Sequence, residues 1–233
     1  DLHSFPTRRS SDLLSFTTMY EGHADVAAGL LGPALAWSVE KRAWGAEAWA
    51  GSDGVAATGK VPGATRASSV PADTTITLGT YTDRPELAEI VVLIAQQLEA
   101  VGFTVIQDVR EYAQIEADAL AGDFDAFLLS RATVLDSGDP VAYMVSDFSS
   151  SGSFSLCFLQ DEGVDAALAA AAGLEAGDER RAAIMEAEAL ILSTDCAVPL
   201  LHERVLQGEA AHVTGAERDP RERALITTAT RVS

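Results

Sequence analysis

The sequence predicts an α/β fold in which helices flank a mainly parallel sheet, and the order of its patterns carries this prediction. A strand pattern over residues 76–81 leads into an amphipathic helical pattern, which stops at Gly102 before a second strand pattern over residues 103–109. Such a βαβ unit forces its two strands to run parallel with a right-handed crossover. The 233 residues are 48% hydrophobic and 22% charged, a globular composition long enough to bury a sizeable core.

The helix of this unit has a predicted start and a predicted end. We expect Asp83 at the N-cap, Pro85 in the first turn, where its missing N–H costs little, and Glu86 completing a capping box. Gly102 suits the position just beyond the last turn. Between these signals, apolar residues recur on one face at helical spacing: Leu87, Ile90, Val91, Ile94, Leu98 and Val101.

Further elements follow along the chain. We expect a helix from about residue 115 to residue 121, closed by Gly122, and then a third, buried strand over residues 124–129 that Asp125 interrupts. The remaining predicted elements are a helix starting near Asp139-Pro140, helices over residues 161–174 and 178–193, a strand over residues 197–205 broken by Pro199, and a short strand over residues 224–228.

The chain divides into four segments. Residues 1–13 lack periodicity and resemble the translation of a sequencing-library adapter, so we expect an artefact there and the natural N-terminus, with its sorting signal, upstream; the alternative is a disordered polar tail. Residues 14–73 end in a Gly-, Ala-, Ser- and Pro-rich stretch typical of an irregular linker. We expect the α/β lobe over residues 74–205 and a charged C-terminal segment over residues 206–233.

The charge balance excludes one broad class of function. Sixteen basic residues against 35 acidic residues give a formal net charge of −19. This charge repels nucleic-acid phosphates and anionic lipid, so we expect no nucleic-acid partner. The sequence also contains no run of about 18 apolar residues, so we expect no membrane-spanning helix in it.

Sequence motifs for cofactor or metal chemistry do not occur. The turn over residues 80–85 has no Gly-x-Gly-x-x-Gly, and neither a Walker loop nor Gly-x-Ser-x-Gly is present. His23, His202 and His212 lie in no metal-ligand spacing, so we expect no metal, and without these motifs we expect no cofactor. The sequence also offers no set of nucleophile, base and oxyanion donors, so we expect no enzyme activity. A general-base role for His202, beside Glu203, is the alternative to a structural one.

The acidic loop of residues 135–140 is the candidate ligand site. It follows the carboxyl end of a predicted parallel strand, which is where open α/β sheets bind their ligands. A carboxylate at this edge can hold a cationic group such as an amine. The alternative is that Asp136, Ser137 or Asp139 caps the helix that starts at Pro140.

The two cysteines, Cys157 and Cys196, leave two alternatives open. They can form a disulfide if the protein is extracytoplasmic and their Cα atoms come close enough, which the sequence does not show. Free buried thiols are the other alternative.

Short motifs in order along the chain resemble those of a known family. Gly122-Asp-Phe-Asp-Ala126 is similar to a G-D-F-D strand, residues 136–140 to a D-Y-x-D-P loop, and Val164-Asp165-Ala-Ala-Leu168 to a V-D-A-L-L helix. Residues 20–24 and 178–200 carry two further motifs, a G-x-A helix end and a D-x-x-E-R … A-P-V-I-P-L stretch. Over most of residues 19–205 the sequence therefore resembles the C-terminal half of the solute-binding proteins that serve ABC importers for oligopeptides, dipeptides and nickel.

The resemblance implies a two-lobed periplasmic-binding-protein-like fold that closes on its ligand through a hinge and performs no chemistry. It implies that this chain is a truncated second lobe, with residues 206–233 returning to the first. In peptide-binding members, the first Asp of the loop motif holds the α-amino group of the ligand, and Asp136 occupies that position. The other candidate ligand-binding residues are Thr133 and Ser137, which stand where the family has aromatic residues, and Asp139.

The implied function is capture of a solute, most simply an oligopeptide, and its delivery to the permease subunits of an ABC importer. Such proteins are extracytoplasmic, as periplasmic proteins or cell-surface lipoproteins, and membrane contact is expected only through an N-terminal anchor that this sequence does not show. Two alternatives belong to other classes, an α/β hydrolase-type enzyme and a regulatory domain that senses a solute.

Overall fold

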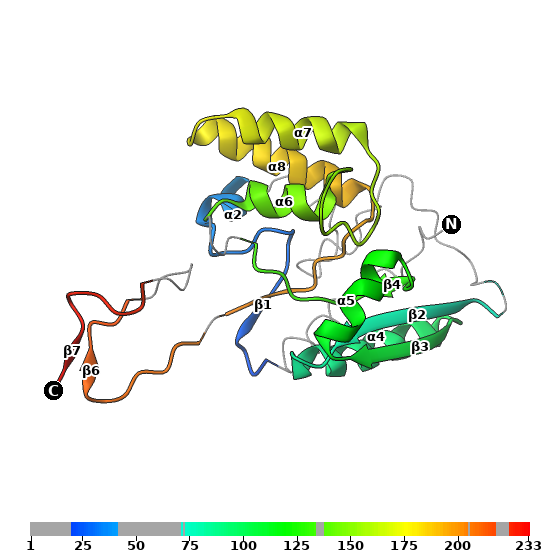
Figure 1. The fold of residues 1–233 in the computed structure, drawn as a ribbon, viewed down its shortest axis with the longest axis horizontal. Coiled ribbons are helices and arrows are strands. Elements are labelled where there is room, and N and C mark those ends of the chain that lie inside the picture. The colour runs from blue at the N-terminus through cyan, green and yellow to red at the C-terminus, as the bar shows by residue number, and fades with distance from the viewer. Residues whose placement is uncertain (1–19, 42–70, 72, 134–137, 205, 218–223) are drawn as a thin grey trace.

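The computed structural model of the protein describes residues 20–41, 71, 73–133, 138–204, 206–217 and 224–233. It shows a layer of helices and, apart from it, a parallel sheet with two helices of its own. In Figure 1, helices α2, α6, α7 and α8 form one layer, and the parallel sheet with α4 and α5 lies below it to the right. The C-terminal end of the chain extends away from both parts. The elements are β1 (Ala24–Val26), α2 (Ala36–Lys41), β2 (Thr75–Tyr81), α4 (Pro85–Ala100), β3 (Thr104–Arg110), α5 (Tyr112–Ala121), β4 (Ala126–Phe127), α6 (Pro140–Phe148), α7 (Glu162–Gly173), α8 (Asp178–Ser193), β5 (Leu201–Glu203), β6 (Val213–Thr214) and β7 (Arg231–Val232).

The parallel sheet has the order β3-β2-β4, with β2 in the centre. All seven residues of β2 pair in parallel with β3, and Leu78 and Gly79 also pair in parallel with β4. The predicted βαβ unit and the parallel α/β fold are therefore confirmed. Gly79 permits a close approach, because a Cβ atom there would lie 2.6 Å from the ring of Phe124 and 2.7 Å from that of Phe127.

The strand β4 is shorter than the six residues predicted, because a side chain replaces part of its hydrogen-bond ladder. The carboxylate of Asp125 accepts a hydrogen bond from the backbone N–H of Thr77 at 2.8 Å, while the N–H of Asp125 donates to the carbonyl of Thr77 at 3.1 Å. Beyond β4, the N–H of Leu128 donates to the carbonyl of Gly79 at 2.8 Å. Asp125 thus interrupts the apolar run, and its carboxylate and backbone N–H make the hydrogen bonds with which the pairing of β4 to β2 begins.

The predicted N-cap of α4 is wrong. Arg84 occupies the N-cap, Pro85 is the first helical residue, and no side chain caps this end. Asp83 instead accepts a hydrogen bond from the N–H of Tyr112 at the start of α5, at 3.2 Å, and Glu86 pairs with Arg84 at 2.6 Å. Asp83 therefore connects the start of α4 to α5, while Glu86 pairs within the first turn of its own helix.

The predicted glycine stops are confirmed. Gly102 follows α4 with φ of +108° and donates to the carbonyl of Glu99, and Gly122 ends α5 with φ of +85°. Both values lie in the region that favours glycine. The helix α5 begins at Tyr112, three residues before the predicted start.

The helical layer has its own hydrophobic core. It is built from α6, α7 and α8 together with Leu30 and Leu31, whereas the sheet, α4 and α5 enclose a second core around Leu78 and Ile90. Glu188 of α8 is fully buried in the helical layer and accepts a hydrogen bond from the N–H of Leu31 at 2.9 Å. The segment between β1 and α2 is therefore fastened to α8 by a buried carboxylate.

The strands near the C-terminus differ from the prediction. Of the predicted strand over residues 197–205, the described residues 197–204 contain the strand β5 at Leu201–Glu203, which pairs antiparallel with β1. Residues 224–228 form no strand. Thr227 and Thr230 make a turn there, because each hydroxyl accepts a backbone hydrogen bond, and this turn precedes β7, which pairs with β6.

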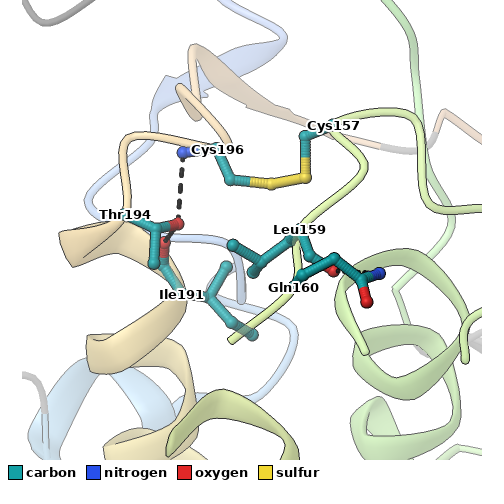
Figure 2. Close-up of a disulfide and its surroundings, with 6 residues drawn as sticks. All are labelled: Cys157, Leu159, Gln160, Ile191, Thr194 and Cys196. Atoms are coloured by element: carbon teal, nitrogen blue, oxygen red, sulfur yellow. Dashed lines mark hydrogen bonds between the residues drawn. A yellow bond between two sulfur atoms is a disulfide. The ribbon is translucent and has the colours of Figure 1, made fainter. Parts of the chain in front are cut away.

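Cys157 and Cys196 form a disulfide that ties the segment after α6 to the end of α8 (Figure 2). Their Cα atoms are 5.6 Å apart. The hydroxyl of Thr194 donates to the carbonyl of Ile191 at 2.7 Å and accepts from the N–H of Cys196 at 3.3 Å, which shapes the end of α8. Of the two alternatives for the cysteines, the structure shows the paired one.

Replacing Glu188 with alanine is expected to lower the free energy of unfolding by about 3 kcal/mol, since it leaves a cavity and a buried N–H at Leu31 without its acceptor. Urea unfolding followed by circular dichroism measures this change. Glu188→Gln keeps an acceptor oxygen and should lose less. The exposed Glu186→Ala on the same helix is the control, and equal losses at both positions would contradict the assigned contact.

The disulfide closes a sequence separation of 39 residues, so its loss is expected to lower the free energy of unfolding by about 4 kcal/mol in the chain-entropy description. Guanidinium unfolding of the oxidised and reduced protein measures the difference. The double variant C157A/C196A should match the reduced protein and show no response to reductant. Identical midpoints for oxidised and reduced protein would disprove the stabilising role.

Candidate functional site

The carboxyl ends of β2, β3 and β4 meet at one edge of the sheet. Open α/β sheets bind ligands at this edge, because the loops that follow the parallel strands gather there. In this protein a set of polar and aromatic side chains follows the strand ends. We call it the strand-end cluster, and it consists of Tyr81, Arg84, Tyr112, Ser130 and Arg131.

Tyr81 fixes the chain as it leaves β4. Its side chain is 6% exposed, and its hydroxyl accepts a hydrogen bond from the N–H of Ser130 at 3.0 Å and donates to the carbonyl of the same residue at 3.4 Å. Its ring packs edge to face against that of Tyr112, with centroids 5.1 Å apart. The last residue of β2 therefore holds the segments that follow both neighbouring strands.

Arg84 links the sheet edge to β5. Its guanidinium donates to Glu86 at 2.6 Å, to the hydroxyl of Ser130 at 3.2 Å and to Glu203 of β5. Burial acts to lower the pKa of Arg84, but the hydrogen bonds to the two carboxylates outweigh it and raise the pKa. Glu203 also accepts from the hydroxyl of Tyr20 at 3.0 Å, and burial followed by the charge of Glu203 raises the pKa of that tyrosine.

Arg131 follows β4 and forms a two-point ion pair with Asp147 of α6. Its Nε and Nη2 atoms lie 2.7 and 2.6 Å from the carboxylate oxygens, and the Asp147 side chain is only 7% exposed. Burial raises the pKa of Asp147, and the hydrogen bonds from Arg131 oppose this effect. The guanidinium also lies over the ring of Phe154 at 4.2 Å. A buried carboxylate and an aromatic ring therefore hold this arginine in place.

The segment that carries Phe154 is attached near both of its ends. Near its start, the carboxylate of Asp165 accepts a hydrogen bond from the N–H of Ser150 at 2.8 Å, and bonding to Ser150 lowers the pKa of Asp165. Near its end lies the disulfide at Cys157. The aromatic face against which Arg131 packs is therefore part of an anchored segment.

The structure places two of the four predicted ligand-binding residues. Thr133 lies two residues beyond Arg131 and is partly exposed. Asp139 caps α6 by accepting from the N–H of Val141 at 3.1 Å, and it pairs with Arg180 of α8 at 2.5 Å. The capping alternative is thus confirmed for Asp139, and the ends of the loop belong to different layers. Asp136 and Ser137 lie outside the described residues.

Sequence reasoning missed the strand-end cluster. Arg84 and Arg131 could have been found by position, because each closely follows the carboxyl end of a predicted parallel strand. The partner of Arg131 could not have been found from the sequence, since Asp147 lies 16 residues away and belongs to no recognised motif.

His202 packs tightly against the backbone of another segment. A Cβ atom at Gly32 would lie 2.8 Å from its Nδ1 atom, and its own Nε2 atom is buried. This packing favours the structural role over the general-base role. Among the residues that the structure describes, no group of three or more His, Cys, Asp or Glu side chains is placed to hold a metal ion. The described helices likewise include none that is long and apolar enough to span a membrane.

Comparisons with known proteins identify the fold. No protein-family model and no curated protein matches the sequence. Solved structures do match, among them a dipeptide-binding protein from Pseudoalteromonas sp. SM9913 in complex with Met-Leu, with a TM-score of 0.67 and 16% identity over 95% of this chain. The oligopeptide-binding protein AppA from Bacillus subtilis, in complex with a nonapeptide, has a TM-score of 0.66 and 14% identity over 96% of this chain. A nickel ABC transporter protein from Bacillus halodurans has a TM-score of 0.62 and 18% identity over 83% of this chain.

The chain has the fold of ABC-transporter solute-binding proteins. The resemblance seen in its short motifs is therefore confirmed at the level of fold. The chain covers 43%, 46% and 41% of these three solved chains, so it spans less than half of each two-lobed solute-binding protein that it matches.

The stability supplied by Asp165 is expected to depend on pH. A lowered pKa means that folding favours the charged carboxylate, so its contribution is present above the ordinary pKa of 3.8 and is lost as the pH falls through the folded-state value. Asp165→Asn should lower the free energy of unfolding by about 1 kcal/mol or less at neutral pH, because the group is partly exposed.

Urea unfolding of the variant and of the unsubstituted chain at a series of pH values below and above 3.8 measures this difference, which should shrink as the solution becomes acidic. Glu162→Gln, in the same turn of α7, is the control because it removes a carboxylate and leaves the bond between Ser150 and Asp165 in place. A difference that stays constant across these pH values would contradict the assigned hydrogen bond.

Proposed function

We propose that this chain is the ligand-binding lobe of an extracytoplasmic solute-binding protein that delivers a peptide or related small solute to the permease of an ABC importer. The observation that carries the proposal is the strand-end cluster at the carboxyl edge of a parallel sheet, in a chain with the solute-binding fold. The matched structures whose titles name dipeptide, oligopeptide and nickel binding support the general class of small-solute capture.

The chemistry of the edge favours a peptide over a metal ion. The strand-end cluster supplies guanidinium, hydroxyl and aromatic groups, which bind the oxygens and side chains of peptides. A nickel site needs imidazole or other metal-binding groups brought to one point. The polar donors at the strand ends therefore point to a ligand rich in acceptor oxygens.

Asp136 is the residue that we propose for the ligand's amino group. Thr133 and Ser137 flank it in sequence and would line the same part of the site. Asp139 is engaged at the N-cap of α6 and with Arg180, so its proposed contribution is to fix the end of this loop. This division of roles follows from the contacts of Asp139 and from the resemblance of the loop.

The disulfide supports the proposed location. Disulfides persist in oxidising compartments such as the periplasm and the cell surface, and they are rare in the cytosol. The Cys157–Cys196 bond is therefore in keeping with an extracytoplasmic protein. The permease partner follows from the proposed function, because a captured solute must be delivered to the membrane-embedded subunits of the importer.

The chain alone is expected to bind peptides weakly, since a single lobe lacks the contacts of a ligand clamped between two lobes. Titration of the ¹⁵N-labelled chain with trialanine, followed by NMR, should show a Kd of about 1–10 mM with shifts at the carboxyl edge of the sheet. Calorimetry should detect no micromolar binding.

Asp136→Asn should weaken this binding about tenfold, and Asp123→Asn, at the opposite edge of the sheet, is the matched control. The absence of any shift at high peptide concentration would contradict peptide binding by this lobe. Micromolar binding by the chain would instead contradict the need for a second lobe.

A further inference from the structure

Arg131 has hydrogen-bond donors that its ion pair does not use. A guanidinium carries five N–H groups, and Asp147 takes those of Nε and one on Nη2. Within the described part of the chain, the Nη1 atom of Arg131 donates no hydrogen bond. The side chain is 33% exposed, so it is open to solvent beside its buried partner.

The position of Arg131 places these donors at the ligand edge of the fold. Arg131 directly follows Ser130, whose backbone N–H donates a hydrogen bond to the hydroxyl of Tyr81 and whose hydroxyl accepts one from Arg84. Phe154 packs against the guanidinium at 4.2 Å. The hydrogen bonds of Ser130, the ion pair with Asp147 and the ring of Phe154 hold the guanidinium of Arg131 in a fixed orientation. A group that recognises a ligand needs such a fixed orientation.

The charge of this donor group is compensated. Asp147 is nearly inaccessible to water, so its carboxylate stays beside the guanidinium, and the pair has a formal net charge of zero. A ligand carboxylate at Nη1 would lie near the carboxylate of Asp147 and be repelled by it. A carbonyl oxygen meets no such repulsion and still gains a hydrogen bond from a charged donor.

We propose that Arg131 is a ligand-binding residue whose Nη1 donates to a carbonyl oxygen of a peptide-like solute, and that Asp147 makes it select neutral acceptors over carboxylates. This inference rests on the proposed function, because it assigns a role within the same sheet edge. It adds a residue that the motifs do not include and a preference that the arginine alone would not have.

Two small ligands test the proposal on the chain itself. Trialanine amide, N-acetylated at its amino end, carries amide carbonyls and no charged group, whereas acetate carries a carboxylate and no amide. NMR titration of the ¹⁵N-labelled chain should show that trialanine amide shifts the Nε–H signal of Arg131 and the amide signal of Ser130. Acetate at the same concentration should shift them several times less.

Variants of the arginine identify the contact. Arg131→Gln should weaken binding of trialanine amide about tenfold, and Arg131→Lys should weaken it less, because lysine keeps a charged donor. Arg181→Gln, an exposed ion-paired arginine on α8, is the matched control and should leave the affinity unchanged. The dispersion of the amide spectrum of each variant reports whether it is folded.

Removing the compensating charge should reverse the preference. Asp147→Asn leaves Arg131 as an uncompensated cation, so acetate should bind severalfold more tightly than to the unsubstituted chain, while trialanine amide should gain less. If Asp147→Asn does not fold, the comparison of the two ligands on the unsubstituted chain decides the preference by itself.

The outcomes separate the two proposals. Shifts at the sheet edge with an unchanged affinity in Arg131→Gln would overturn the role of Arg131 and leave peptide binding intact. Equal shifts from acetate and trialanine amide would overturn the preference for neutral acceptors. No shift at any residue would overturn this inference together with peptide binding by the lobe.

Discussion

The parallel pairing of β2 with β3 is the constraint on which the rest of the structure depends. The helix α4 must cross from the end of one strand to the start of the next, so both carboxyl ends point to the same edge. The pairing of β2 with β4 adds a third strand end there. The side chains that follow these strands therefore become neighbours although they are almost fifty residues apart, as Tyr81 and Ser130 show.

Charge compensation is the second organising feature. The arginines at the ends of the three parallel strands are each paired with carboxylates: Arg84 with Glu86 and Glu203, Arg110 with Asp108 and Asp118, and Arg131 with Asp147. In a chain with a formal net charge of −19, these arginines do not make the edge basic. Their guanidinium groups are oriented by these carboxylates, so that they present hydrogen-bond donors without an uncompensated positive charge.

Features that depend on neighbouring residues could be predicted from the sequence. Gly102 and Gly122 end their helices as expected. Each follows a helical pattern directly, at a position where the chain takes a positive φ that favours glycine. The helix α6 was predicted in the same way, since Asp139 and Pro140 form a local start signal, and it begins at Pro140 with Asp139 as its N-cap.

Features that depend on distant partners could not be predicted. The cap expected from Asp83 is absent because that carboxylate finds the N–H of Tyr112, 29 residues away. The length of β4 depends on the bond between Asp125 and Thr77, 48 residues apart. Neither partner could be chosen from spacing alone, since each side chain had a plausible local role.

The hydrogen bond from Arg84 to Glu203 connects the carboxyl edge of the parallel sheet to the strand β5, which has a consequence for ligand binding as well as for stability. The strand β5 packs with β1 against the sheet core, and the chain that leaves β1 enters the core of the helical layer at Leu30. A solute that accepted a hydrogen bond from Arg84 would compete with Glu203 for that donor. A shift of β5 would in turn change the affinity of Arg84 for that solute. If a solute displaced Glu203 from Arg84, its binding and the placement of β5 would be coupled, with the same coupling free energy in both directions.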